Sequence, residues 1–465
     1  MKLKYLFTLT LIIQIAGFSY SQNNKTDLSK FWIKENDRVC YIGNSITAGG
    51  EYWFFIDLYA HTRYPQLKFE SFNCGIAGNS SQDVLNRMNS DILIHRPTIA
   101  TLKLGMNDVQ RDLYSSEKAS KETIDKQNDA LIEYEKKMSL IAKQLALQNC
   151  RLIIFTPSIY DQTAKISTAN NFGVNDALGK CSVIAKKLAT KYNALLVDFY
   201  SVMNRINHEK QLKDSTYTLI GNDRVHPGMP GHLVMAYTFL TALHADSLVS
   251  KIALDANPKK VIDAIHCQIK NLELDQNKLS FDVLSYSLPF PIPTEAKPAL
   301  ELVPFTQKLN QELLSVKNLK SGKYLLMMDK DTIGIFQDSD LARGINLSLY
   351  PQTPQYRQAT QVMDISLKRH NLISGKMRIM AMIEESALKG IKDPNNMPEA
   401  KTLLDAQLEK IKGKDYYGWV RDRYADYLEM KPKEKEIAEE IQRLGQEIYA
   451  MNRPKEHHYQ LIQKK

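Results

Sequence analysis

The sequence predicts an α/β fold: a three-layer α/β/α sandwich around a parallel sheet, followed by a small β-rich segment and a C-terminal helical region. Two observations indicate this. Short apolar runs alternate with longer stretches of helical periodicity over residues 37–254, and the pattern changes after about residue 257. At 465 residues the chain is too long for one ordinary core, so two or three domains are expected.

The N-terminus has the pattern of a secretory signal. Two lysines, an apolar run over residues 5–18 and small residues at 19 and 21 follow one another. We therefore expect residues 1–21 to be a signal peptide and the protein to be secreted or periplasmic. The alternative is an uncleaved membrane anchor, but the run is short for a full span. No stable membrane span is expected after the signal is removed.

Five short apolar runs predict buried parallel strands in residues 22–256, the first domain after the signal. Parallel strands covered by helices on both faces are apolar almost throughout, and active sites in such sheets form outside the carboxyl ends of the strands. The runs are "RVCYIG" (38–43), "LKFESFN" (67–73), "TIATLKLG" (98–105), "RLIIFTP" (151–157) and "ALLVDF" (194–199).

Helices are predicted between and after these strands. In residues 122–149, apolar side chains recur at spacings near 3.6 residues and its multiples, as on one face of a helix. Two further helices are predicted over 177–192 and from 231 to about 254. The order of strands and helices indicates a sheet with helices on both faces.

The second half of the chain has a different pattern. Residues 257–345 contain short strand-like runs between polar turns, with a proline-rich connector at 287–298, and we expect a β-rich accessory segment. Residues 346–465 are predicted to be mainly helical, because apolar positions recur there at helical spacing. The Lys- and Glu-rich tail from Lys431 is predicted to be a solvated helix.

Composition excludes several function classes. The formal net charge is +9, and removing residues 1–21 takes away two lysines and no acid, leaving +7 spread along the chain. This modest surplus does not indicate a nucleic-acid partner. The five cysteines form neither a CxxC nor a metal-binding spacing, so neither a metal site nor a disulfide scaffold is expected.

Four polar, glycine-containing segments follow strands of the predicted sheet. Three come directly after a strand, so their side chains should converge at one edge of the sheet. The fourth follows the fifth strand and opens the last helix of the domain. The segments are "GNSIT" (43–47), "NCGIAGNSS" (73–81), "LGMND" (104–108) and "DRVHPGMPGH" (223–232).

The residue types in these segments fit hydrolytic chemistry. The Ser45 hydroxyl needs a base to act as a nucleophile, and His226 can be that base. Asp223, three residues before His226, can hold the imidazole in the required tautomer. The backbone N–H groups of Ser45 and Gly78 and the Asn107 side-chain amide can bind the oxyanion that forms in acyl transfer.

These four segments resemble the motif blocks of the SGNH (GDSL) hydrolase family, in order and spacing, over about residues 37–254. The matching residues are Ser45, Gly78, Asn107, Asp223 and His226. The resemblance implies a flavodoxin-like sandwich and ester hydrolysis through an acyl-serine intermediate, with neither metal nor organic cofactor. One departure is Gly43-Asn44-Ser45, because many members have aspartate where this chain has Asn44.

Each segment alone also fits a structural role, such as a turn or a helix cap. Taken together, they favour a serine esterase. The export signal favours an ester substrate on an extracellular polymer, and O-deacetylation of a carbohydrate is the first interpretation. The alternatives are a lipid acylhydrolase, lysophospholipase or thioesterase, and a non-catalytic glycan-binding protein on the same fold. The aromatic residues 52–54 fit either the floor of a sugar-binding cleft or helix packing, and the sequence does not fix the oligomeric state.

Overall fold

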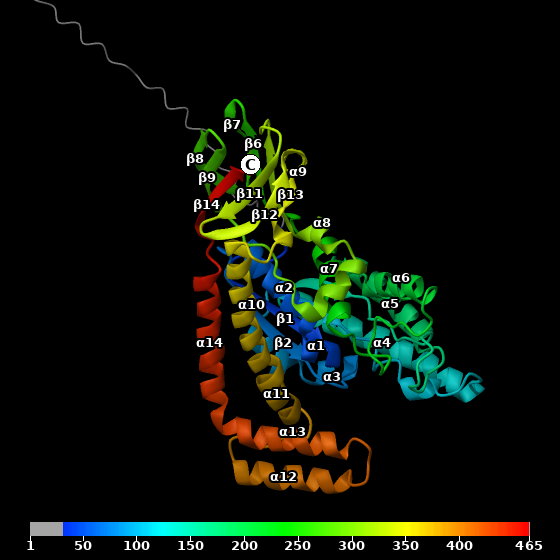
Figure 1. The fold of residues 1–465 in the computed structure, drawn as a ribbon. Coiled ribbons are helices and arrows are strands. Elements are labelled where there is room, and N and C mark those ends of the chain that lie inside the picture. The colour runs from blue at the N-terminus through cyan, green and yellow to red at the C-terminus, as the bar shows by residue number, and fades with distance from the viewer. Residues whose placement is uncertain (1–30, 465) are drawn as a thin grey trace, which may run out of the picture.

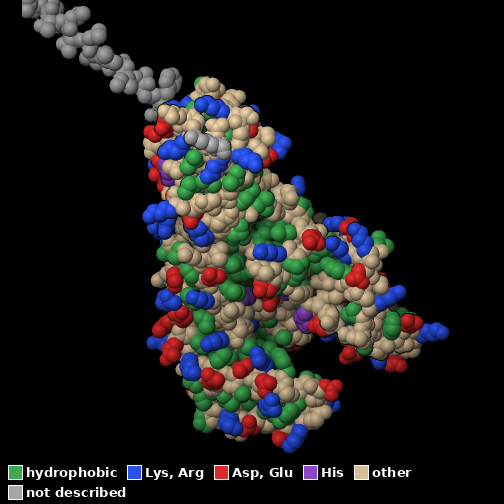
Figure 2. All heavy atoms as spheres, in the orientation of Figure 1, with side chains coloured by type: hydrophobic (Ala, Val, Ile, Leu, Met, Phe, Trp, Pro, Cys, Tyr) green, Lys and Arg blue, Asp and Glu red, His purple; other side chains and the backbone are tan. Residues whose placement is uncertain are grey.

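The computed structural model describes residues 31–464, so the predicted signal peptide lies outside the described residues. Figure 1 shows an α/β sandwich with a β-rich part at one end and long C-terminal helices running along its side. Figure 2 shows acidic and basic side chains intermixed over the visible face.

A five-stranded parallel sheet forms the centre of the sandwich. Its strand order is β2-β1-β3-β4-β5, the order of flavodoxin-like sheets. Each neighbouring pair is parallel, so the carboxyl ends of all five strands lie along one edge, here called the carboxyl edge. The strands are β1 (Asp37–Gly43), β2 (Phe69–Gly75), β3 (Ile99–Lys103), β4 (Arg151–Phe155) and β5 (Leu195–Val197).

Both faces of this sheet are buried, as alternate residues of β1 show. Val39 and Tyr41 belong to one hydrophobic cluster and Cys40 and Ile42 to another, and all four are 0% exposed. The three-layer α/β/α prediction is confirmed. Helices α2 (Glu51–Arg63), α6 (Phe199–Gln211) and α7 (Met229–Ala242) cover one face, and α3 (Ser81–Asn86), α4 (Lys121–Leu147) and α5 (Val174–Lys191) cover the other.

Shorter elements connect the sandwich. Helix α1 (Ser45–Gly49) follows β1 directly. A π-helical turn, Met88–Ile92, and two 3₁₀ turns, Leu93–His95 and Arg111–Tyr114, lie in the connections before and after β3. All five cysteines are buried free thiols, where they act as small apolar side chains.

The predicted helix from residue 231 to about 254 is wrong at its C-terminal end. Helix α7 stops at Ala242, and residues Leu248–Ala256 form strand β6. The apolar run "LVSKIALDA" is short, and a run of this length does not distinguish a buried strand from a helix. In the structure it pairs with β10 and β7, so long-range pairing decides its conformation.

The β-rich part consists of two sheets, with orders β13-β10-β6-β7 and β12-β11-β14-β9-β8. The last strand of the chain, β14 (Glu456–Gln463), lies in the middle of the second sheet. The other elements are β7 (Lys259–Ile265), β8 (Cys267–Asp275), β9 (Lys278–Ser285), β10 (Gln311–Lys317), β11 (Lys323–Met328), β12 (Asp331–Gln337), β13 (Ile345–Asn346), α8 (Phe305–Leu309), α9 (Asp338–Arg343) and the 3₁₀ turns Thr294–Glu301 and Leu347–Leu349.

The C-terminal region is helical as predicted, except for β14. The tail predicted as a solvated helix from Lys431 is helical only to Met451, because its last residues pair with β9 and β11. Between residues 31 and 464, no helix is both long and apolar enough to cross a membrane. The helices are α10 (Pro354–Leu372), α11 (Arg378–Glu384), α12 (Met397–Lys410), α13 (Tyr417–Met430) and α14 (Glu434–Met451), with a π-helical segment, Ile373–Met377, between α10 and α11 and a 3₁₀ turn, Lys431–Lys433, before α14.

One lysine is buried at the end of β3. Lys103 is 1% exposed, and its Nζ lies 3.5 Å from the Ser158 hydroxyl. Burial lowers the pKa of this ammonium to about 7. Above that pH the unfolded chain binds a proton that the folded chain does not hold, so the contribution of Lys103 to stability rises with pH.

We therefore predict that wild type gains stability relative to Lys103→Met as the pH rises from 7 to 9. The expected gain in the difference between their free energies of unfolding is about 2 kcal/mol, because each pH unit changes it by at most about 1.4 kcal/mol. Urea denaturation of both proteins at three pH values measures it. Parallel pH dependence of the two proteins would contradict the assignment.

Candidate active site

Ser45 lies where the chain leaves β1, the strand between β2 and β3, at the carboxyl edge of the sheet. β1 ends at Gly43, and α1 begins at Ser45. Asn44 between them is 1% exposed, and its side-chain oxygen accepts a hydrogen bond from the Ile46 N–H at 3.4 Å. Asn44 thus caps α1, a role that an amide fills as well as a carboxylate does.

His226 and Asp223 lie next to Ser45. The Ser45 Oγ is 2.7 Å from His226 Nε2, and His226 Nδ1 is 2.5 Å from Asp223 Oδ2. The side chains of His226 and Asp223 are 47% and 52% exposed, so solvent and solutes reach them. A carboxylate on Nδ1 favours the tautomer whose Nε2 accepts a proton from the serine hydroxyl.

Asp223 is held as a carboxylate by its own loop. Its Oδ1 accepts hydrogen bonds from the backbone N–H groups of Val225 at 3.0 Å and His226 at 2.9 Å. Partial burial raises the pKa of Asp223, but the hydrogen bonds from the His226 backbone and ring outweigh it and leave that pKa below its ordinary value. The group therefore stays ionised and can stabilise a protonated His226.

Arg224, which was not among the predicted site residues, fixes this loop. Arg224 has a positive φ of 64° and is 4% exposed. Its guanidinium donates to backbone carbonyls of the 161–168 loop, including Asp161 at 2.8 Å and Thr168 at 2.9 Å. The buried arginine thus holds Asp223 and His226 on either side of it against a second loop.

The predicted oxyanion donors come from neighbouring loops at the same edge. Gly78 has a φ of 79°, a conformation that glycine adopts readily, and nothing lies within 4 Å of where a Cβ would be. The Asn107 amide donates to the carbonyl of Asn79 at 2.9 Å, which ties the loop after β3 to the loop that holds Gly78. An amide has two N–H donors, so the second stays available to a ligand.

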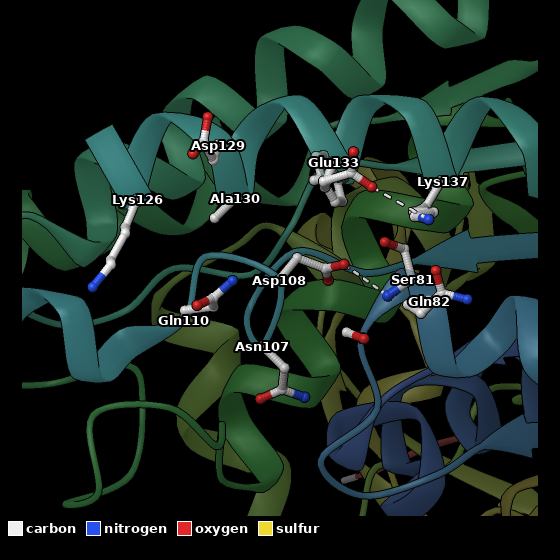
Figure 3. A pocket seen from close by; sticks show the side chains of 12 residues that line it. Ser81, Gln82, Asn107, Asp108, Gln110, Lys126, Asp129, Ala130, Glu133 and Lys137 are labelled. Atoms are coloured by element: carbon white, nitrogen blue, oxygen red, sulfur yellow. Dashed lines mark hydrogen bonds and ion pairs between the residues drawn. The ribbon is translucent and has the colours of Figure 1, made fainter. Parts of the chain in front are cut away.

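A polar pocket of about 490 Å³ borders this loop pair on the side of α4. Figure 3 shows that the Asn107 side chain points away from α4, whereas Asp108 points toward Ser81, whose N–H it accepts at 2.7 Å. The pocket is lined by Ser80, Ser81, Gln82, Asn107, Asp108, Gln110, Lys126, Asp129, Ala130, Glu133, Tyr134 and Lys137. Carboxylates, amides, hydroxyls and ammonium groups therefore surround it.

Two further expectations concern the surroundings of the site. The aromatic residues 52–54 do not form the floor of a cleft: Tyr52, Trp53 and Phe54 are 0–4% exposed and pack in the core beneath α1. Within residues 31–464, no group of three or more His, Cys, Asp or Glu side chains is arranged to hold a metal ion.

Comparison with known proteins gives consistent matches. A family model described as GDSL-like Lipase/Acylhydrolase matches residues 39–239. An acetylxylan esterase of Geobacillus stearothermophilus is 24% identical over 223 residues, covering 45% of this chain and 94% of that protein. A solved structure described as "BT4096 a gut microbial diltiazem-metabolizing enzyme" is 31% identical with a TM-score of 0.85, covering 93% of this chain and 98% of that one.

The geometry predicts that Ser45 reacts covalently with a fluorophosphonate. Wild type should be labelled at Ser45, and Ser45→Ala should not be labelled. Asp223→Asn should slow labelling by about 10³–10⁴-fold, because the imidazole loses the partner that sets its tautomer. Intact-mass and peptide mass spectrometry follow the reaction.

Asp214→Asn is the matched control, since Asp214 is exposed and its side chain bonds only to Thr216 among the described residues. Its labelling rate should equal that of wild type. Labelling at another serine, or an unchanged rate in Asp223→Asn, would contradict the arrangement.

Proposed function

We propose that this chain, which belongs to the GDSL-like lipase/acylhydrolase family and is a carboxylic ester hydrolase, removes acetyl groups from the hydroxyl oxygens of carbohydrates. The observation that carries the proposal is the hydrogen-bonded series Ser45–His226–Asp223 at the carboxyl edge. The pocket that borders the Asn107 loop is lined mainly by carboxylate, amide, hydroxyl and ammonium side chains, which suit a hydroxyl-rich leaving group.

The proposed reaction begins with attack of the Ser45 Oγ on the ester carbonyl carbon while His226 Nε2 accepts the hydroxyl proton. Asp223 keeps the imidazole oriented and stabilises its charge. The negative charge on the carbonyl oxygen is bound by the N–H groups of Ser45 and Gly78 and the free N–H of the Asn107 amide.

The tetrahedral intermediate then breaks at the bond to the sugar oxygen, which takes the proton from His226 and leaves as an alcohol. The acetyl group stays on Ser45. A water molecule gives a proton to the same imidazole and attacks the acetyl carbon. The bond from this carbon to Ser45 Oγ then breaks, Oγ takes the proton back from His226, and acetic acid leaves and ionises to acetate.

The acetylxylan esterase among the relatives supports acetate as the acid, because its name gives an acetyl ester as its substrate. The other relative is described as metabolising diltiazem. The second match extends over both halves of the chain, so the β-rich part and the C-terminal helices belong to the shared architecture. A small acyl group also fits the half-buried Ser45, because such a group needs no long apolar channel.

Residues 1–21 have the pattern of a secretory signal, so we propose that the protein is secreted or periplasmic. An extracellular glycan is a substrate that fits this location. Figure 2 shows a hollow between the α12–α13 pair and the sandwich, at the level of α1 and α3 in Figure 1. A hollow open to solvent suits a substrate that extends beyond the ester.

Acetate release from acetylated xylan and xylo-oligosaccharides tests the substrate class. We predict release by wild type and none by Ser45→Ala. With p-nitrophenyl esters, kcat/KM should fall by about tenfold or more from acetate to octanoate, because a site adapted to acetyl groups gains no transition-state binding from a longer chain.

The alternatives predict different results. Faster hydrolysis of octanoate, palmitate or acyl-thioester substrates would favour a lipid acylhydrolase, lysophospholipase or thioesterase. Binding of the glycan without hydrolysis of any ester would favour a carbohydrate-binding protein on this fold.

A further inference from the structure

One face of the C-terminal helices lies against the segments that carry Ser45 and Gly78. Three side chains spaced four residues apart make the contacts. The ring Nε2 of His370 donates to the Gly49 carbonyl in α1 at 3.0 Å, and the Ser374 hydroxyl accepts from the Asn73 amide in β2 at 3.0 Å. Arg378 Nε donates to the Gly75 carbonyl at the end of β2.

The π-helical segment Ile373–Met377 lies within this contact face. Such segments are rare and occur frequently at functional sites. Asn73 also donates to the Ala48 carbonyl at 2.8 Å, so one amide joins α1, β2 and the C-terminal helices. The contacts therefore reach both segments that supply the proposed backbone oxyanion donors.

Arg378 is part of a buried ionic cluster with Arg87 and Asp91, here called the arginine cluster. Its two terminal nitrogens donate to the Asp91 carboxylate at 2.5 and 2.6 Å. Arg87 Nη1 donates to Oδ2 of the same carboxylate, an oxygen that also accepts from Arg378 Nη2. Side chains in the cluster are 2–8% exposed, and two guanidinium groups share one carboxylate.

Arg87 links the arginine cluster to three segments next to the proposed site by hydrogen bonds. Its Nη2 donates to the carbonyls of Cys74 at 2.9 Å and Gly43 at 3.4 Å, and its Nε donates to the Asn79 side chain at 2.8 Å. Gly43 lies two residues before Ser45, and Asn79 directly follows Gly78. Asn79 also accepts the Asn107 amide through its backbone carbonyl.

We propose that Arg378 is a positioning residue for the oxyanion-binding loop 75–79, so that the C-terminal helices complete the active site. The proposal rests on the proposed function of this site as an esterase. Oxyanion donors act only when they are held where the charge develops, and a displacement of about 1 Å costs about 10²-fold in rate. Arg378 fixes the first residue of the loop directly and its last residue through Asp91 and Arg87.

The contribution of the arginine cluster to folding stability is not sufficient to explain why these charges are buried. A buried ion pair is often no more stabilising than apolar residues of similar volume, because the charges lose their hydration. A guanidinium fork, however, fixes several oxygens in one geometry, which an ammonium group does not do. The arginine cluster is therefore suited to setting the shape of the loop.

The test compares Arg378→Met and Arg378→Lys with wild type, using p-nitrophenyl acetate. We expect kcat and kcat/KM to fall together by about 100-fold in Arg378→Met, and KM to stay nearly unchanged, because the lost contribution belongs to the transition state. Arg378→Lys keeps the positive charge but loses the forked guanidinium group. We expect its kcat and kcat/KM to be lower than those of wild type by about tenfold or more.

Lys431→Met is the matched control. Lys431 is a buried cation of the same helical region, paired with Glu384 and Glu434 and distant in sequence from the arginine cluster. It should lower the melting temperature but leave kcat unchanged. An equal loss of kcat in Lys431→Met and Arg378→Met at matched stability would overturn the proposal, as would wild-type kcat in both Arg378 variants.

Amide hydrogen exchange of residues 74–80 gives a readout that needs no substrate. Exchange should be faster by about tenfold or more in both Arg378 variants and unchanged in Lys431→Met. Unchanged exchange in the Arg378 variants would overturn the proposal. If wild type hydrolyses no ester, the proposed function fails, and the exchange measurement still decides whether Arg378 positions the loop.

Discussion

Backbone packed directly on backbone sets the spacing of the candidate site. A Cβ on Gly75 would lie 2.3 Å from the Ala48 nitrogen, so only glycine lets the end of β2 approach α1 this closely. The contact joins the segment that begins with Ser45 to the strand that leads into Gly78. Because β1 and β2 are parallel neighbours, the two segments leave the sheet side by side. The distance between the N–H groups of Ser45 and Gly78 therefore depends on the direct backbone contact between Gly75 and Ala48.

The C-terminal half is interlocked with this sheet. Tyr449 of α14 exchanges hydrogen bonds with the backbone of Phe69, at the start of β2, at 3.0 and 3.1 Å. Asn452 donates to the carbonyl of His61 in α2 at 2.9 Å. The following residues form β14, between β9 and β11. The helices of residues 354–451 thus begin and end at the β-rich part. Arg378 lies in the first half of this helical segment, which leads away from the β-rich part. The pairing of β14 with β9 and β11 fixes the position of the C-terminal end of this helical segment.

The local pattern of apolar and polar residues was sufficient to predict the α/β sandwich. Strands buried on both faces give continuous apolar runs, and the polar segments after β1, β2 and β3 mark the carboxyl edge. Pattern failed where partners distant in sequence decide the conformation. The run at Leu248–Ala256 is a strand because β10 pairs with it, and the tail after Met451 is a strand because β9 and β11 flank it.

The same limit applies to the surroundings of the candidate site. Ser45, Asp223 and His226 are found from the chemistry of short segments, and the structure places them within hydrogen-bond distance. Arg224 acts through carbonyl groups of another loop, and Arg378 meets Asp91 across 287 residues of sequence. Backbone carbonyls carry no sequence signature, so residues that act on them are visible only in the folded chain.

Asn44 shows how the site keeps its geometry with a neutral residue beside the nucleophile. Its side chain caps α1 while it is almost fully buried, and the charge partner of His226 comes from Asp223 on a separate loop. A carboxylate at position 44 would make the same cap but add a buried negative charge next to the place where the proposed oxyanion forms. Like charges at short range in a poorly solvated site repel strongly. An amide provides the cap without that repulsion, so the departure from the common motif is compatible with the proposed chemistry.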